Sequence, residues 1–336
     1  MTKVKDQVIT DRFAIYNADC MDVIQTLDNN SIHLSIYSPP FANLYTYSSS
    51  ERDMSNVNSI DEFLQQYEYL VKEMSRVTMK GRINAIHITD ICDVTGTLSD
   101  FPNKIIELHK KHGFEYKNRI TVWKEPLKVR IRTMVKSLMH KYIMEDSTKC
   151  FTANPDYILI FKKKGENPIP VAHPFGLTHY AGEEPILKGM LQAWNNQNES
   201  NFTEEELWKH LQDTKIEGKI TKLNHYIWQR YASSTWIDVR DGNVLPFRDS
   251  KEEDDEKHVT PTQLDVIDRL VDLYSNPNEI VFSPFMGIGT DVYSPISMGR
   301  KAIGIELKDS YFKQATINLK HAENRFANEQ KQIKLI

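Results

Sequence analysis

The sequence has few cysteines and no long apolar segment. Its three cysteines, Cys20, Cys92 and Cys150, lie far apart and form no C-x-x-C pair, which argues against a disulfide framework and against a zinc site. No apolar run approaches the roughly 20 residues that a membrane-spanning helix requires. The N-terminal residues 1–7 also lack the apolar core of a signal peptide. We therefore expect a protein of the reducing cytoplasm, with no membrane partner and no metal ion.

A large charge imbalance is missing as well, because 42 Lys or Arg against 46 Asp or Glu give a net charge of −4. The 40% hydrophobic and 26% charged residues are typical of a globular protein. With 336 residues, the chain can form one large domain or two ordinary ones. The segment 117–141 differs from the rest, with eight Lys or Arg and one acid, Glu125. In an otherwise acidic chain, this segment predicts a phosphate-facing surface, with a merely solvated surface as the alternative.

The pattern of a nucleoside-binding unit lies near the C-terminus. Residues 280–282 form an apolar run that predicts a buried strand, Gly287 and Gly289 predict a tight turn, and a helical pattern then runs to Met298. A second apolar strand ends in an acid, Glu306. Glycines allow the backbone to approach a ligand, and a carboxylate in this place can accept hydrogen bonds from ribose hydroxyls. Although a lone Gly-x-Gly is often a plain turn, the acid after the second strand favours a βαβ unit that holds a nucleoside.

A second motif follows the predicted strand 32–37. It consists of Ser38, Pro39, Pro40 and Phe41, and two prolines in succession fix an extended loop at the end of the strand. In an open parallel sheet, ligands bind at that end of the strands. Taken alone, the motif would be read as a plain loop.

Alternating strand and helix patterns extend through most of the chain. Helices are predicted at 60–77, 100–112, 261–274 and 309–326, and strands at 83–88, 114–123 and 156–161. A Ser59–Glu62 capping box opens the first of these helices, and Gly81 is expected to break it. The alternation stops from Gly165 to about Trp236, where prolines and tryptophans accompany short helical pieces. We expect an α/β fold with a Rossmann-like, doubly wound, mostly parallel sheet and an inserted subdomain.

Taken together, the motifs resemble the S-adenosylmethionine-dependent DNA amino-methyltransferases of the β arrangement, in which the catalytic motif precedes the cofactor motif. Five landmarks of that family occur in order: Asn17-Ala-Asp-Cys20, Ser38-Pro-Pro-Phe41, His258-Val-Thr-Pro-Thr-Gln-Leu264, Ser283-Pro-Phe-Met-Gly-Ile-Gly-Thr290 and Ile303-Gly-Ile-Glu306. Each landmark is weak alone, but five in this order are specific. The resemblance implies a class I methyltransferase fold, a catalytic part over 1–164, a target-recognition insert over 165–240 and a cofactor-binding part over 241–336.

The resemblance also implies a role for each motif. Ser38, Pro39, Pro40 and Phe41 would be catalytic, and Glu306 would bind the ribose of S-adenosylmethionine. The other cofactor-binding residues implied are Asp19, Cys20, His258, Thr260, Ser283, Phe285, Gly287, Gly289 and Thr290. Duplex DNA would be contacted by Lys124, Lys128, Arg130, Arg132 and Lys136. The family usually has Asp in place of Ser283, Pro in place of Val259 and a Lys-Pro pair in place of Thr262-Gln263, which puts the detailed cofactor contacts in doubt.

The chemistry of amine methylation fits the serine and the diproline. The exocyclic amine of cytosine or adenine is a poor nucleophile, because its lone pair is delocalised into the ring. Acceptors for both amine hydrogens, here the Ser38 hydroxyl and the Pro39 carbonyl, favour a pyramidal nitrogen that can attack a methyl group. Phe41 offers a face on which the base can stack after it leaves the duplex. Within the family, Ser at the first position is associated with cytosine N4 and Asp with adenine N6, so we expect cytosine N4 with adenine N6 as the alternative.

Other classes of function remain as alternatives. A nicotinamide-dependent oxidoreductase could use the same βαβ unit, but the third glycine of G-x-G-x-x-G is replaced by Val292. An RNA methyltransferase or an inactive DNA-binding module are further possibilities. Cytosine C5 methylation requires a cysteine nucleophile, and none of the cysteines has that setting. The resemblance implies a bacterial or phage-encoded monomer or homodimer, with or without a partner restriction enzyme.

Overall fold

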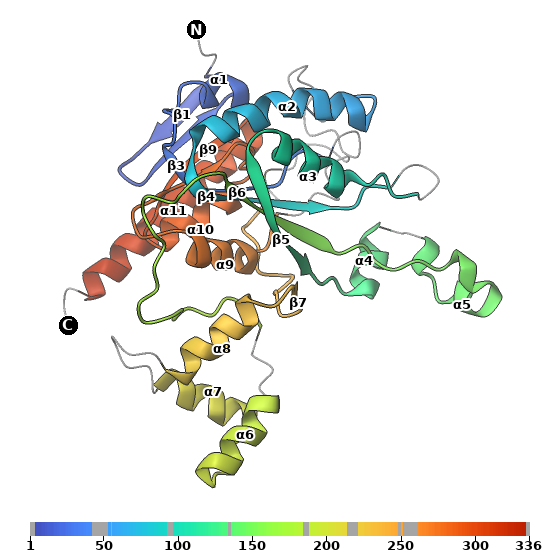
Figure 1. Ribbon diagram of the computed structural model, residues 1–336, viewed down its shortest axis with the longest axis vertical. Helices are drawn as coiled ribbons and strands as arrows, with labels where there is room; N and C mark the ends of the chain where they lie inside the picture. The colour runs from blue at the N-terminus through green and yellow to red at the C-terminus, as the bar shows by residue number, and fades with distance from the viewer. Residues whose placement is uncertain are drawn as a thin grey trace.

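A computed structural model describes residues 4–41, 53–54, 56–92, 97–133, 136–183, 188–213, 221–247, 250 and 261–333. Within this part of the chain, one nine-stranded sheet forms the centre, in the order β1-β2-β9-β8-β3-β4-β6-β5-β7 (Figure 1). The strands are β1 (Asp6–Ile9), β2 (Phe13–Asn17), β3 (Ile32–Tyr37), β4 (Thr78–Thr89), β5 (Phe114–Val122), β6 (Asp156–Lys163), β7 (Thr235–Trp236), β8 (Ile280–Ser283) and β9 (Lys301–Glu306).

The middle of the sheet is parallel. The neighbours β2, β9, β8, β3 and β4 all run in one direction, whereas β6 runs antiparallel to both β4 and β5. From β8 the chain winds outward through β9, and from β3 it winds outward in the other direction through β4. The boundary between β8 and β3 is therefore the switch point of a doubly wound sheet, where ligands bind in such folds. The predicted fold class is confirmed.

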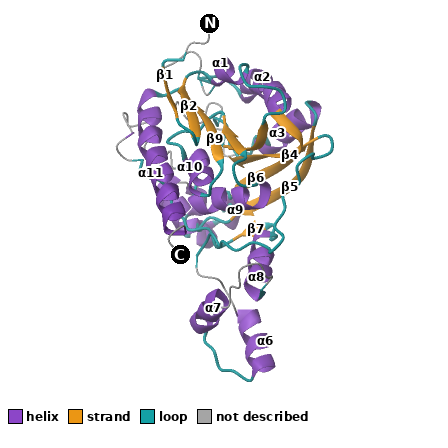
Figure 2. Cartoon of the chain, turned by 90° about the vertical axis from the view of Figure 1, so that its left-hand side faces the viewer, coloured by secondary structure: helices purple, strands orange, loops and turns teal. Residues whose placement is uncertain are grey.

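Helices cover both faces of the sheet (Figure 2). On one face, α1 (Cys20–Ile24), α2 (Ile60–Val77) and α3 (Phe101–Lys111) enclose a core with the sheet. On the other face lie α9 (Leu264–Tyr274), α10 (Thr290–Ser297) and α11 (Asp309–Ile333). No helix among the described residues is both long and apolar enough to span a membrane.

Local sequence signals explain the start of α2 but not its end. Ser59 caps the helix by accepting from the Glu62 backbone N–H, and the Glu62 side chain reaches back toward the cap. We expected Gly81 to break this helix, but the helix stops at Val77 and Gly81 lies inside β4 with φ +74°. A Cβ at Gly81 would lie 2.4 Å from the Asn167 backbone nitrogen, so the glycine is required by a close chain approach.

The remaining helices project away from the sheet in two groups (Figure 1). One group follows β5 and comprises α4 (Pro126–Thr133), η2 (Lys136–Leu138), α5 (Lys141–Glu145) and η3 (Ser147–Lys149). The other lies within the expected insert and comprises α6 (Lys188–Asn198), α7 (Glu204–Asp213) and α8 (Lys222–Tyr231), which share a small apolar core. The insert then returns to the sheet through β7, which pairs with β5.

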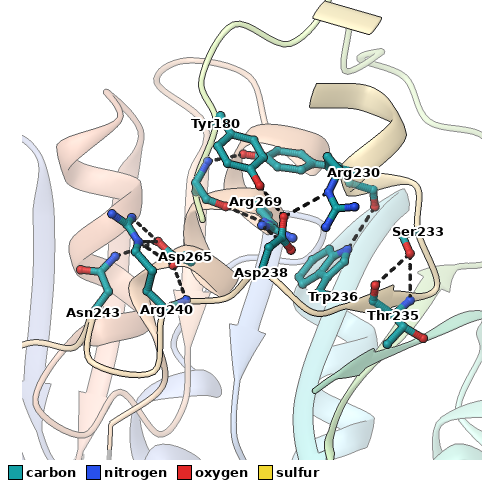
Figure 3. Close-up of polar contacts among 12 residues, drawn as sticks. Tyr180, Arg230, Ser233, Thr235, Trp236, Asp238, Arg240, Asn243, Asp265 and Arg269 are labelled. Atoms are coloured by element: carbon teal, nitrogen blue, oxygen red, sulfur yellow. Dashed lines mark hydrogen bonds and ion pairs between the residues drawn. The ribbon is translucent and has the colours of Figure 1, made fainter. Parts of the chain in front are cut away.

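A buried ionic joint fixes the insert to the sheet (Figure 3). Arg269 of α9 is fully buried and lies 3.0 Å from the Asp238 carboxylate, which also accepts from Tyr180 and Arg230. The Arg269 guanidinium faces the rings of Tyr180, Tyr231 and Trp236 at 4.9–5.8 Å from their centroids. Since these aromatic residues come from both ends of the insert, one arginine of the core helix holds both ends.

This joint gives a first testable prediction. Asp238→Ala should lower the free energy of unfolding by about 3–5 kcal/mol, because the Arg269 guanidinium would stay buried without its counter-charge. Urea denaturation followed by circular dichroism measures the change. The matched control is Asp241→Ala, which removes only the exposed pair with Lys128 and should barely move the transition. Equal changes in the free energy of unfolding for the two variants would contradict the stabilising role of the Asp238–Arg269 pair.

Candidate functional site

Four parallel strands bring the predicted motifs to one edge of the sheet. The strands β2, β9, β8 and β3 are neighbours in the sheet. Asp19 follows the carboxyl end of β2, Glu306 is the last residue of β9, the glycine turn follows β8, and Ser38 follows β3. The register places Asn17 beside Glu306 and Ser283 beside Gly304. On the other side of the switch point, Ser35 pairs with Phe282. The structure therefore gathers at one edge the motifs that lie at both ends of the sequence.

The turn after β8 is built around two glycines with positive φ. Gly287 has φ +55° and Gly289 has φ +94°, a region that side chains disfavour. A Cβ at Gly289 would contact Ala315 of α11 at 3.3 Å, so this glycine allows the helix to pack closely. A Cβ at Gly287 would meet nothing within 4 Å, so the backbone of this residue borders open space. Gly289 then caps α10, whose first residue is the buried Thr290.

The carboxylate of Glu306 holds this turn from the adjacent strand. Its Oε2 accepts from the Gly287 backbone N–H at 2.9 Å and its Oε1 accepts from the Lys308 N–H at 2.7 Å. Burial raises the pKa of Glu306 to about 7, against the lowering effect of these hydrogen bonds, and the nearby Asp53 carboxylate raises it further. Each carboxylate oxygen can accept more than one hydrogen bond, so Glu306 can hold the turn and still accept from a ligand.

Asp19 and Cys20 lie next to Glu306 in different roles. The Ala18 N–H donates to the Glu306 carbonyl at 3.1 Å, which joins the end of β2 to the end of β9. Asp19 caps α1 by accepting from the Met21 N–H at 2.9 Å. The Cys20 side chain is buried, and this burial, together with the Asp19 charge, raises the pKa of its thiol well above the ordinary value. Cys20 is therefore a packing residue near the site rather than a reactive thiol.

Ser283 has a partner that the sequence interpretation missed. Its hydroxyl donates to Asp291 Oδ2 at 3.0 Å, and both side chains are buried. Burial raises the pKa of Asp291 to about 7, although the hydrogen bond from Ser283 lowers it. An acid is thus supplied from the first turn of α10, beside the position where relatives usually carry Asp. The position of Asp291 in the first turn of this helix was the only sequence signal that could have indicated the contact with Ser283.

The aromatic residue before the Ser38–Phe41 corner contacts an aromatic residue that precedes the glycine turn. Tyr37 at the end of β3 and Phe285 after β8 have ring centroids 6.1 Å apart. The Tyr37 hydroxyl is paired with that of Tyr67 at 3.0 Å, and its burial raises its pKa to about 12. Pro39 is buried, whereas Ser38, Pro40 and Phe41 are half-buried. The two motifs, far apart in sequence, therefore lie side by side.

A polar cluster continues the same edge beyond Ser38. His87 of β4 lies 2.9 Å from Asp156 of β6 through Nε2 and 3.1 Å from the Thr262 hydroxyl through Nδ1. Lys124, two residues after β5, contacts the same Asp156 oxygen at 2.7 Å. The sequence interpretation missed His87, Asp156 and Thr262, because nothing in the spacing of these residues indicates that β4, β5 and β6 are neighbours.

The predicted DNA-binding residues differ in their surroundings. Lys124 is in the polar cluster, and Lys128 pairs with Asp241 at the surface at 2.9 Å. Arg130 is half-buried on α4. The side chains of Arg132 and Lys136 lie outside the described residues, as do His258 and Thr260. Among the described residues, no group of three or more His, Cys, Asp or Glu is placed to hold a metal ion.

Comparison with known proteins adds independent findings. A family model described as DNA methylase, of the N6 and N4 methyltransferases, matches residues 32–317. The chain is 23% identical over 319 residues to the Type II methyltransferase M1.MboII of Moraxella bovis, a match that covers 92% of this chain and 97% of that protein. A stretch of 95 residues, 28% of this chain and 32% of the relative, is 36% identical to the DNA adenine methyltransferase YhdJ of Escherichia coli.

Solved structures share the fold. The PvuII DNA methyltransferase, named as cytosine-N4-specific, aligns with a TM-score of 0.57 at 13% identity and 97% coverage of both chains. TTHA0409 of Thermus thermophilus, described as a candidate DNA modification methylase, aligns with a TM-score of 0.57 at 18% identity, covering 93% of this chain and 96% of that one. Its complex with S-adenosyl-L-methionine aligns with a TM-score of 0.55, covering 91% and 93%.

The buried Asp291 predicts how stability changes with pH. Because its pKa is raised from 3.8 to about 7, the folded state binds a proton that the unfolded state loses above pH 4. Its stabilising contribution is therefore complete below pH 4 and declines as the pH rises to 7. Asp291→Asn should reduce the fall in the free energy of unfolding between pH 5 and 8 by about 1–3 kcal/mol. Urea titrations at both pH values test this, with the exposed Asp61→Asn as control. An unchanged pH dependence would refute it.

Proposed function

The chain belongs to the DNA methylase family, whose model spans residues 32–317, and from this premise we propose that it is a site-specific methyltransferase acting on cytosine N4. In this proposal, the methyl group passes from S-adenosylmethionine to the exocyclic amine of a base extruded from duplex DNA. The observation that carries the proposal is the contact of Tyr37, which precedes Ser38, with Phe285, which precedes the glycine turn, across the paired strands β3 and β8. The edge of one sheet thus offers a nucleoside site next to a pair of amine acceptors.

The residues at the glycine turn fit the proposed cofactor. The Gly287 backbone borders open space that a ligand can enter. The Glu306 carboxylate, which already accepts from the Gly287 N–H, can also accept hydrogen bonds from ribose hydroxyls. Asp19 lies at the neighbouring strand end, in reach of the same edge. When bound, S-adenosylmethionine supplies a methyl group on a positively charged sulfur, which makes transfer to an amine favourable. The remaining work of the protein is to position the reacting groups.

The Ser38 corner supplies the groups that act on the amine. The Ser38 hydroxyl and the Pro39 carbonyl can accept the two amine hydrogens, which favours the pyramidal nitrogen. The burial of Pro39 and the pairing of β3 with both β4 and β8 keep these acceptors in place. Half-buried Phe41 offers a ring face to the extruded base. Extrusion costs a few kcal/mol, which contacts with the flipped base must offset.

The choice of base rests on Ser38. Within the family, serine at this position is associated with cytosine N4, and the PvuII enzyme of similar fold is named for that specificity. Adenine N6 is the second candidate, since the 95-residue match to YhdJ involves a DNA adenine methyltransferase. Tritiated methyl transfer to duplex DNA, followed by nucleoside chromatography, separates N4-methylcytosine from N6-methyladenine. Label only in RNA, or no label at all, would overturn the proposal.

The insert over 165–240 is proposed to read the DNA sequence. Its helices project from the sheet, and the Arg269 joint sets their orientation relative to the edge that carries Ser38 (Figure 1). The relative M1.MboII is named as a Type II methyltransferase, and a partner restriction enzyme is proposed as well. A cytoplasmic location is proposed as well, because the proposed substrate is host DNA.

Removing the Ser38 hydroxyl should slow methyl transfer. Ser38→Ala should lower kcat by about 10²–10³-fold, the usual effect of losing one preorganised polar contact to the reacting group, with cofactor affinity unchanged. Single-turnover methyl transfer and calorimetry with S-adenosylhomocysteine measure the two quantities. The control is Ser31→Ala, which removes a hydroxyl from an exposed turn. Unchanged turnover of Ser38→Ala would count against the amine contact.

Removing the Glu306 carboxylate should weaken cofactor binding. Glu306→Ala should raise the Kd for S-adenosylhomocysteine by about 10–100-fold, because an acceptor for ribose hydroxyls is lost. Isothermal titration calorimetry measures this Kd. Glu323→Ala, on the distant part of α11, serves as the control. If Glu306→Ala bound S-adenosylhomocysteine with wild-type affinity, Glu306 would not be the residue that binds the ribose.

A further inference from the structure

The polar cluster of Lys124, His87, Asp156 and Thr262 has no role in the methyl transfer proposed above. Its members come from four separate places: the loop after β5, the end of β4, the start of β6 and the residues before α9. Asp156 Oδ2 receives both Lys124 Nζ at 2.7 Å and His87 Nε2 at 2.9 Å. Polar groups so enclosed require mutual hydrogen bonds, so the cluster is a fixed structure rather than a mobile surface pair.

The cluster lies next to the proposed amine acceptors. Tyr37 of β3 pairs with Ile86 of β4, and Ser38 and His87 are the next residues on each strand. Paired residues of parallel strands point to the same face, with the strands about 4.8 Å apart. Moving outward from Ser38, the edge therefore presents His87 first, then Asp156 with Lys124.

Hydrogen-bond donors and acceptors in the cluster can be assigned. Burial raises the pKa of Asp156, but His87 and Lys124 outweigh it and hold that pKa well below its ordinary value. Asp156 is therefore an ionised acceptor, and His87 must donate its Nε2–H to it. When Nε2 carries the single ring proton, Nδ1 accepts from the Thr262 hydroxyl. Among the described residues, Asp156 is the one partner of the Lys124 ammonium, which has three N–H donors.

Burial separates Lys124 from the other lysines of the basic segment. Its side chain is 9% exposed, whereas that of Lys128 is 68% exposed. A phosphate contact requires an accessible cation, and Lys128 meets this requirement. Lys124 is instead held at the sheet edge by Asp156, which His87 joins to the strand beside Ser38.

We propose that Lys124 is a specificity-determining residue that donates to the ring nitrogen N3 and the carbonyl O2 of an extruded cytosine. This inference rests on the proposed function and deepens it. The Watson–Crick edge of cytosine carries the N4 amine, N3 and O2 in a row. When the cytosine amine is bound at Ser38, the acceptors N3 and O2 therefore point along the edge of the sheet. Adenine offers only N1 beside its amine, with a C–H group where cytosine has O2. A cation fixed by Asp156 therefore favours cytosine.

The test first identifies the modified base and then measures binding. Modification-sensitive sequencing of DNA from the expression host gives the recognition motif and the methylated base. Two duplexes with that motif are then compared in the presence of S-adenosylhomocysteine. In one, the target cytosine stands opposite an abasic site, which lowers the cost of extrusion; in the other, the target position itself is abasic. Fluorescence anisotropy gives Kd for each duplex over a range of salt concentrations.

Lys124→Met should weaken binding of the cytosine duplex by about 10–100-fold, because a charged donor to the base is lost. It should leave both the abasic duplex and the salt slope unchanged. Lys128→Met is the matched control, and it should weaken both duplexes equally and reduce the salt slope by about one unit. Lys124→Arg keeps a positive partner for Asp156 and hence the fold, but its larger planar group should cause the same selective loss.

Each contrary outcome has a distinct meaning. Equal weakening of both duplexes by Lys124→Met, with a lower salt slope, would make Lys124 a phosphate contact and overturn the inference. Wild-type binding by both Lys124 variants would overturn it too. These results with N4-methylcytosine as product would leave the proposed function intact. N6-methyladenine as product would overturn both the cytosine assignment and the role of Lys124, and the absence of methylation would overturn the proposed function itself.

Discussion

The site depends on one parallel pairing, that of β3 with β8. These strands are separated by most of the chain, yet Leu34 pairs with Val281 and Ser35 with Phe282. A parallel sheet aligns the carboxyl ends of neighbouring strands, so this pairing alone decides that Ser38 and the glycine turn share an edge. The Tyr37–Phe285 contact continues it beyond the hydrogen-bonded residues. A shift by one residue would turn every side chain of β3 to the other face.

Hydrogen-bond donors explain why buried acids are tolerated at this edge. Asp291 and Glu306 lie at the ends of elements on either side of the glycine turn, and both have a pKa raised to about 7 by burial. Their oxygens are held by the Ser283 hydroxyl and by the Gly287 and Lys308 N–H groups. Burying a carboxylate is costly unless it is hydrogen-bonded. The turn thus supplies donors that let acids stay at the edge where a nucleoside would bind.

Most of the fold could be predicted from the sequence, because its signals are local. Apolar runs located β3, β6, β8 and β9, and the Ser59–Glu62 capping box located the start of α2. The side-chain contacts between separate strands and helices could not be predicted from such local signals. The Ser283–Asp291 and His87–Asp156 pairs depend on side-chain direction and register, which apolar patterning does not encode. Gly81 shows the same limit, because its positive φ is set by the approach of Asn167, far along the chain.

The two proposed levels of recognition are attached to separate parts of the sheet. The polar cluster of Lys124, His87, Asp156 and Thr262 is attached to β4, β5 and β6, and Asp156 holds it through His87 of β4 and Lys124 after β5. The insert is attached through α9, where Arg269 binds Asp238 and the carbonyl of Ala181. Changes within the insert helices can therefore alter the proposed DNA-reading surface without moving Lys124 or Ser38. Because Thr262 joins His87 to the chain just before α9, the two attachments meet at that helix. A rotation of α9 would disturb both, which gives a physical reason for the full burial of Arg269 at its centre.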